Sequence, residues 1–199
     1  MNLGRLTGFL AASIALTGCG IGRVDSGPVD DLSTWSRLPL PADQALATRA
    51  AQGPSSCRAA GDDKPVRILL QDRRTAWTAD FLFTAGAQFG SCFVSSAQGG
   101  TGGGSGPLPE AMTGALSIDQ NSAGMVANGN AHDVGGRVAD PVVEVTVVLE
   151  DGQTVAASVK NGYWLAWWPI NARATSVLGL DASGGEVLRV DVPDPGAKP

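Results

Sequence analysis

Apolar and polar residues alternate most regularly in the segment VVEVTVVLEDGQTVAASVKNGYWLAWWP, residues 142–169. Asp151-Gly152 and Asn161-Gly162 divide this segment into three runs. Glycine accepts a positive φ angle where a chain reverses, so Asp-Gly and Asn-Gly between such runs are strong hairpin signals. The pattern predicts an antiparallel meander with strands at 142–149, 153–159 and 163–168.

The spacing of the apolar positions also predicts the register, because alternate residues of a strand share one face. A three-residue loop at 150–152, with Gly152 as a left-handed bulge residue, pairs Val147 with Val155 and keeps the apolar sets together. The same loop length at 160–162 pairs Val159 with Tyr163. Trp164 and Trp168 then lie on the reverse face of a central strand that is covered on both sides.

A second meander is predicted over residues 66–95, where the hairpin at 72–75 pairs Leu70 with Trp77. In its last strand, Cys92 points away from Phe89 and Phe93. The segment Pro41–Gln52 predicts a helix with Leu46 and Ala50 on its apolar side, lying on the Cys92 side of the sheet. Three apolar residues before this helix are predicted to close a core edge: Trp35, Leu38 and Leu40.

The remaining segments carry weaker patterns. Glycine-rich residues 98–107 predict a flexible loop, which lacks the Lys-Ser/Thr of a phosphate-binding loop. Residues 107–130 predict one short strand at 115–119, and the C-terminal part predicts strands at 176–181 and 186–192. The predicted fold is mainly β, with two meanders packed as a sandwich or partly open barrel and one short N-terminal helix. It forms a single domain at 35–192, followed by a disordered tail at 193–199.

The N-terminus has the features of an export signal. Arg5 precedes an uncharged apolar run that ends in Leu16-Thr17-Gly18-Cys19. This run has signal-peptide length and falls short of the roughly 20 residues of a membrane helix. Its end resembles the lipobox of bacterial lipoproteins, which implies cleavage after residue 18, acylation of Cys19 and a flexible spacer at 19–34. An ordinary secretory signal or an uncleaved anchor is the alternative, and every version places the domain on the extracytoplasmic side.

Net charge and cysteine content limit the expected partners and predict a disulfide. Without Arg5 the chain has 13 basic and 19 acidic residues, a net charge of about −6, which disfavours nucleic acid and electrostatic docking on anionic lipid. The expected partners are the membrane, through the lipid, and a protein or cell-wall component. Cys57 and Cys92 are predicted to pair in an oxidising compartment, and two buried free thiols are the alternative.

The sequence offers few groups for catalysis. The single histidine, His132, precedes Asp133, but strand neighbours point to opposite faces and no Gly-x-Ser-x-Gly motif is present. We therefore interpret His132 as an exposed loop residue. One histidine and two paired cysteines do not make a usual zinc site, so neither a metal nor another cofactor is expected.

Four residues are the candidates for a binding surface: Arg73, Arg74, Trp164 and Trp168. The two arginines could hold an anionic group, and the two indoles could stack on a ligand. The structural alternative is a hairpin tip capped by Asp72, and a strand whose indoles belong to the core.

The pattern DG-x-TV with NGYW-x-AWWP resembles uncharacterised exported or membrane-anchored proteins of actinobacteria. Asp72, Arg73, Arg74 and Cys92 match further positions of that pattern, and Thr75 replaces a glycine. The resemblance implies a fold and a location but no activity. We expect a non-enzymatic, lipid-anchored domain that binds a protein or envelope component. A carboxylate-dependent glycan hydrolase and a sensor of envelope stress are the alternatives.

Overall fold

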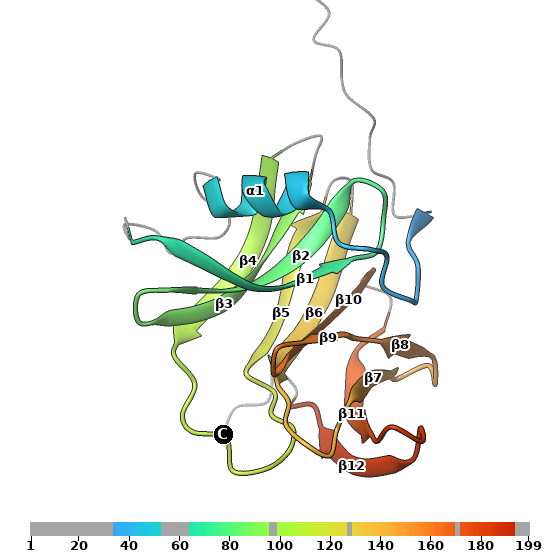
Figure 1. Cartoon of the computed structure of the whole chain (residues 1–199). Helices are drawn as coiled ribbons and strands as arrows, with labels where there is room; N and C mark the ends of the chain where they lie inside the picture. The colour runs from blue at the N-terminus through green and yellow to red at the C-terminus, as the bar shows by residue number, and fades with distance from the viewer. Residues whose placement is uncertain (1–33, 53–63, 96–98, 127–128, 170–171, 194–199) are drawn as a thin grey trace, which may run out of the picture.

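The computed structural model describes residues 34–52, 64–95, 99–126, 129–169 and 172–193. Three four-stranded antiparallel sheets and one short helix make up this part of the chain, which confirms the predicted mainly β class (Figure 1). The described strands form no closed barrel. Cys19 and Cys57 lie outside the described residues.

The first sheet has the order β1-β2-β3-β4, with β1 at Val66–Arg73, β2 at Thr78–Ala85, β3 at Gln88–Ser95 and β4 at Gly99–Pro107. The predicted pairing of Leu70 with Trp77 is wrong, because Leu70 lies opposite Leu82. The ladder continues through Asp72 and Arg73, whose backbone groups pair despite their charged side chains. The turn therefore comes later in the chain than the apolar pattern indicates.

β4 replaces the predicted loop at 98–107. A strand needs only backbone pairing, and glycine permits a close approach here, because a Cβ on Gly103 would lie 2.2 Å from the Ser91 carbonyl oxygen. β4 is a terminal strand of its sheet, so only β3 pairs with it.

The predicted helix is present as α1, Gln44–Gln52, and it begins later than Pro41. The Asp43 carboxylate caps it by accepting hydrogen bonds from the amides of Ala45 (2.8 Å) and Leu46 (3.2 Å). Leu46 and Ala50 are buried in one cluster with Cys92, which confirms the predicted side of the sheet. Leu38 does not close a core edge, because 65% of it is exposed.

The other two sheets have the orders β5-β6-β10-β9 and β12-β11-β7-β8. Their strands are β5 (Gln120–Val126), β6 (Gly129–Arg137), β7 (Glu144–Leu149), β8 (Thr154–Ala156), β9 (Ser158–Lys160), β10 (Tyr163–Pro169), β11 (Ala174–Leu180) and β12 (Glu186–Asp191). The predicted strands at 176–181 and 186–192 correspond to β11 and β12. The sequence prediction missed β5 and β6, and residues 115–119 form only one isolated bridge, between Leu116 and Val138.

The predicted 142–168 meander is divided between these two sheets. Val147 pairs with Val155 across a three-residue loop in which Gly152 has φ +80°, so the first predicted register is confirmed. At Ala157 the chain passes from β8, paired with β7, to β9, paired with β10. The single run of alternating residues at 153–159 therefore contributes one strand to each of the two sheets.

The second turn differs from its prediction. Asn161 and Gly162 have φ angles of +55° and +80°, and they form a two-residue turn that pairs Val159 with Trp164. Such a turn matches the right-handed twist of a hairpin, and asparagine tolerates the positive φ angle. The face of Val155 and Val159 therefore continues into Trp164 and Trp168 instead of Tyr163 and Leu165.

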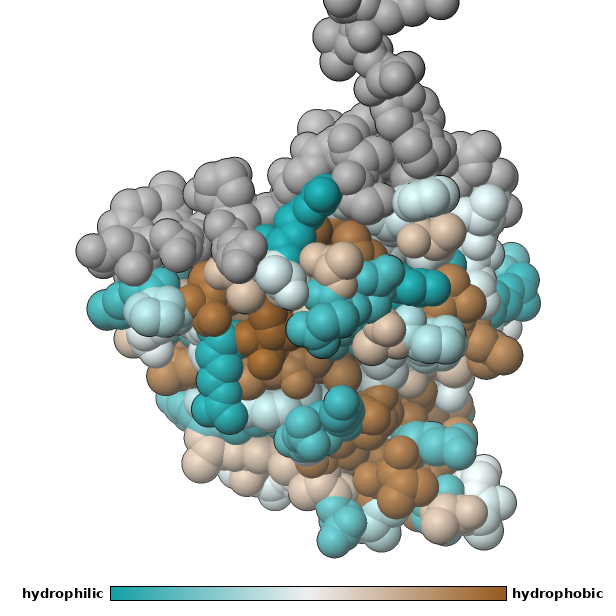
Figure 2. Space-filling view, turned by 45° about the horizontal axis from the view of Figure 1, so that its top comes forward, coloured by the Kyte–Doolittle hydropathy of each residue, from teal (hydrophilic) through white to brown (hydrophobic). Residues whose placement is uncertain are grey.

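The central layer is the β5-β6-β10-β9 sheet, as predicted for a strand with aromatic residues on both faces. Trp164 and Trp168 pack against the third sheet, while Leu165 and Trp167 pack against the first. Hydrophobic areas on the face shown in Figure 2 are interrupted by hydrophilic side chains.

Within the described residues, no helix is both long enough and apolar enough to cross a membrane.

Candidate binding groove

The four residues predicted as a binding surface do not form one. Trp164 and Arg74 are 0% exposed and Trp168 is 2% exposed, so none of the three can meet a ligand without unfolding. The Arg73 side chain is 21% exposed and forms an ion pair with Asp43 at 3.3 Å. The sequence prediction of an aromatic and cationic surface is therefore wrong for Arg74, Trp164 and Trp168, because packing between the sheets buries these three side chains.

Arg74 instead lies at the centre of a buried polar cluster. Its Nε donates to the Asp72 carboxylate at 2.9 Å, Nη1 donates to the Arg37 carbonyl oxygen at 2.6 Å, and Nη2 donates to the Ala156 carbonyl oxygen. Ser158 donates to the other oxygen of Asp72 at 2.9 Å. The cluster connects the N-terminal segment, β1 and the β8–β9 strand, so its contribution is structural.

The aromatic residues of β10 also have internal partners. The indole nitrogens of Trp164, Trp167 and Trp168 donate to the carbonyl oxygens of Ser117, Asp72 and Ala172, respectively. His132 is not a loop residue, since it lies in β6 and stacks on Trp168 with ring centroids 5.9 Å apart. Burial lowers the pKa of His132.

Two further carboxylates lie buried between the first and second sheets. Asp133 accepts hydrogen bonds from Ser91 at 2.6 Å and from Ser122 at 2.5 Å. Asp80 accepts one from the Phe81 amide, while its Oδ2 has no hydrogen-bond partner. Burial raises the pKa of both carboxyls, and the charges of Asp133 and Asp72 raise the pKa of Asp80 further. Both side chains are 0% exposed and cannot reach a substrate.

The raised pKa of Asp80 predicts a pH-dependent stability. Above the unfolded-state pKa near 4, the unfolded chain loses this proton before the folded chain does, so stability falls as the pH rises, by up to about 1.4 kcal/mol per pH unit for one group. Asp80→Asn cannot ionise, and we expect it to become progressively more stable than the wild type between pH 4 and 7. Urea unfolding at a series of pH values measures this difference.

Asp181→Asn is the control, because its carboxyl is exposed in a turn and has its pKa lowered, chiefly by the Ser183 hydroxyl. Its contribution has the opposite sign: it is present above pH 4 and is lost as the pH falls. A constant difference in stability between Asp80→Asn and the wild type across pH 4–7 would contradict the prediction.

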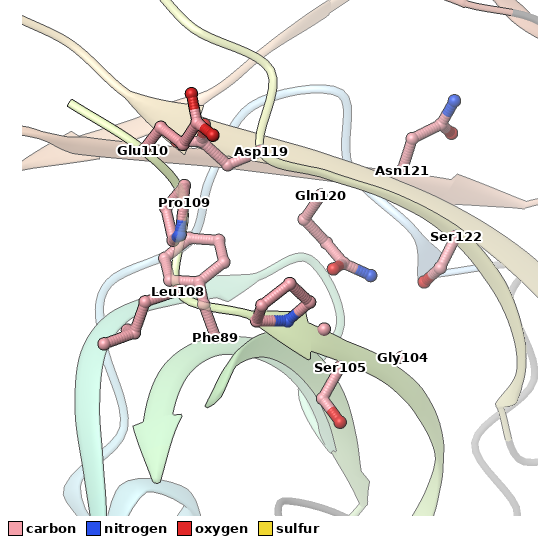
Figure 3. Close-up of a pocket in the computed structure, with 12 residues that line it drawn as sticks. Phe89, Gly104, Ser105, Leu108, Pro109, Glu110, Asp119, Gln120, Asn121 and Ser122 are labelled. Carbon is pink, nitrogen blue, oxygen red and sulfur yellow. The ribbon is translucent and has the colours of Figure 1, made fainter. Parts of the chain in front are cut away.

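An open groove lies between the terminal strands of two sheets, β4 and β5. Its volume is about 530 Å³, and Figure 3 shows its lining side chains. Phe89, Pro107, Leu108 and Pro109 provide an apolar side, and Leu108 is 49% exposed. Ser105, Asn121 and Ser122 add polar groups.

Gln120 differs from the other polar residues of this groove in its burial and hydrogen bonding. It is only 9% exposed, and its carboxamide makes no hydrogen bond to any of the described residues. Figure 3 shows the side chain extending from β5 into the space between the strands. Gly104 leaves room for it, since a Cβ there would lie 3.0 Å from the amide nitrogen. A nearly buried carboxamide without a partner offers two donors and an acceptor to a ligand.

The two carboxylates of the groove have different surroundings. Asp119 accepts two hydrogen bonds from the Arg137 guanidinium, at 2.8 and 3.0 Å, and one from Ser117 at 2.9 Å. Glu110 is exposed and makes no ion pair or side-chain hydrogen bond with another residue in the described ranges. Glu110 therefore remains available to a cationic group, whereas Asp119 is already neutralised.

Sequence analysis missed this groove. Its lining comes from β3, β4, β5 and the segment between β4 and β5, and the prediction treated most of this region as irregular. The only local signal is Pro107-Leu108-Pro109, an apolar tripeptide directly after the glycine-rich run. Nothing in the order of residues indicates that Gln120 lies opposite Gly104.

Comparison with protein-family models, curated proteins and solved structures gives no match for the chain.

Cys92 is buried and disulfide-bonded, while its predicted partner Cys57 lies outside the described residues. Within the described ranges, no group of three or more histidine, cysteine, aspartate or glutamate side chains is arranged to hold a metal ion.

Proposed function

We propose that this chain is a lipid-anchored extracytoplasmic domain that binds an extended polypeptide segment of an envelope protein in the groove between β4 and β5. The observation that carries the proposal is the carboxamide of Gln120, which is nearly buried and has no hydrogen-bond partner in the part of the chain that the structure describes. The signal-like N-terminus and Cys19 support the location. The domain acts by holding its partner and does not catalyse a reaction.

The chemistry of the groove favours a peptide. A glutamine carboxamide can donate to a backbone carbonyl oxygen and accept from a backbone N–H at once. Leu108, which is 49% exposed, offers apolar contact beside it, and Glu110 can pair with a cationic side chain. The terminal strands β4 and β5 border the site, and peptides often bind in extended form along such strands.

A glycan hydrolase is the second candidate, because Glu110 and Asp119 line the same groove. Glycoside hydrolysis requires two carboxyl groups that are free to exchange protons or attack the sugar. Arg137 and Ser117 already occupy the oxygens of Asp119. This arrangement favours binding over hydrolysis. Glu110→Gln would leave a binding role partly intact and would abolish hydrolysis.

A photo-reactive residue placed in the groove tests the proposed function. We expect Leu108→p-benzoylphenylalanine to form a covalent adduct with one envelope protein when intact cells are irradiated. Val187 on β12 is the matched control, since it is 42% exposed against 49% for Leu108 and does not line the groove. Mass spectrometry of the adduct identifies the partner and the peptide attached.

Adding Gln120→Ala should reduce the Leu108 adduct about tenfold, because losing hydrogen bonds worth roughly 1.4 kcal/mol lowers affinity by that factor. An adduct of equal yield at Val187, or one that is insensitive to Gln120→Ala, would reject the groove as the site. Turnover of purified cell-wall glycan by the wild type but not by Glu110→Gln would favour the hydrolase instead.

A further inference from the structure

The polypeptide leaves the described structure beside the groove. The Asn121 side-chain nitrogen donates to the carbonyl oxygen of Pro193 at 3.1 Å, and Asn121 lines the groove next to Gln120. Pro193 is the last described residue, and Asp194-Pro-Gly-Ala-Lys-Pro199 follows it. The next six residues therefore start at one side of the binding site.

The composition of this segment matches the groove. Pro195 and Pro199 favour extended backbone, which lowers the entropy lost on docking. Lys198 follows Pro193 by five residues, so an extended chain carries it up to about 17 Å from Asn121. Glu110 borders the same groove with a carboxylate that no described residue pairs with, and it lies with Asp119 at the end away from Asn121 in Figure 3.

We propose that residues 194–199 bind in the groove between β4 and β5, with the Lys198 ammonium paired to Glu110, and that they compete there with the partner polypeptide. The competition rests on the proposed function, whereas the docking of the segment does not. The backbone amides of the segment supply the donors and acceptors that Gln120 lacks. The domain thus carries its own occupant, and a partner must displace it to bind.

Zero-length cross-linking of the full mature chain in detergent tests the docking. A carbodiimide joins an amine to a carboxylate only when they touch, so we expect a Lys198–Glu110 isopeptide in tandem mass spectra. Glu110→Gln should abolish this product. Lys160, in the turn after β9, is the internal control and should give no product with Glu110. A Lys198 product that is equally abundant with Glu144 or Asp151 would overturn the proposal, as would the absence of a Lys198–Glu110 product.

An equal mixture of ¹⁴N and ¹⁵N protein separates intramolecular docking from an exchange between two copies. Products of mixed isotope content would show that the segment occupies the groove of a second molecule, which overturns the intramolecular proposal.

A separate experiment tests the competition between the segment and the partner polypeptide. Lys198→Ala should increase the adduct at the photo-reactive position 108 several-fold. If the isopeptide forms but no envelope adduct appears at 108, the proposed function fails while the docking stands.

Discussion

Replacing Arg74 with methionine should lower the free energy of unfolding by about 3–5 kcal/mol. The substitution keeps much of the side-chain volume but leaves the Asp72 carboxylate buried without its counter-charge. It also removes the donors to the carbonyl oxygens of Arg37 and Ala156. Urea unfolding monitored by tryptophan fluorescence measures the loss.

The double variant Asp72→Asn/Arg74→Met makes the test more specific. Removing one partner of a buried ion pair is costly mainly because it leaves the other charge unpaired, so the double variant should lose less stability than the sum of the two single variants. Arg189→Met is the matched control, since its ion pair with Glu186 is exposed and should contribute less than about 1 kcal/mol. Strict additivity of the Asp72 and Arg74 effects would contradict a buried, coupled pair.

Trp167→Ala should destabilise the domain by a similar amount, about 3–5 kcal/mol. Trp167 is 0% exposed and lies between the first two sheets, where its ring meets Phe93 edge to face with centroids 5.6 Å apart. Its indole nitrogen donates to the Asp72 carbonyl oxygen at 2.9 Å. The substitution therefore removes both a large apolar contact and the partner of a buried carbonyl group.

Two variants separate these contributions. Trp167→Phe keeps most of the ring volume and should cost less, because it loses mainly the indole hydrogen bond. Trp77→Ala is the matched tryptophan control: Trp77 is 41% exposed in the β1–β2 turn, and its loss should change stability by less than about 1 kcal/mol. Equal losses for Trp77→Ala and Trp167→Ala would contradict the three-layer arrangement of the core.

Both large effects concern residues that the sequence analysis assigned to a binding surface or to the strand that carries it. Arg74 and the tryptophans of β10 have the chemistry of ligand contacts, but in this fold they connect layers. The groove that replaces them as the candidate site is lined by less conspicuous residues, chiefly Gln120 and Leu108. Its proposed function depends on the Gln120 amide, which has no partner among the described residues, and no residue pattern indicates that property.

The alternation of side chains and the Gly-containing turns determined much of the fold without any tertiary information. The mainly β class, the loop at 150–152 and the side of the sheet covered by α1 all follow from local rules of parity and turn geometry. These rules act over a few residues, so the sequence expresses them directly.

Contacts between distant segments decided the rest. The partners of Arg74 include Arg37 and Ala156, which are 37 and 82 positions away, and only the assembled layers make its burial possible. β4 is a strand because β3 offers it a backbone edge, although its glycines carry no pattern. The groove exists because β4 and β5, the terminal strands of different sheets, border the same space. Side-chain alternation indicates which residues face inward, but the packing of the layers determines what they meet there.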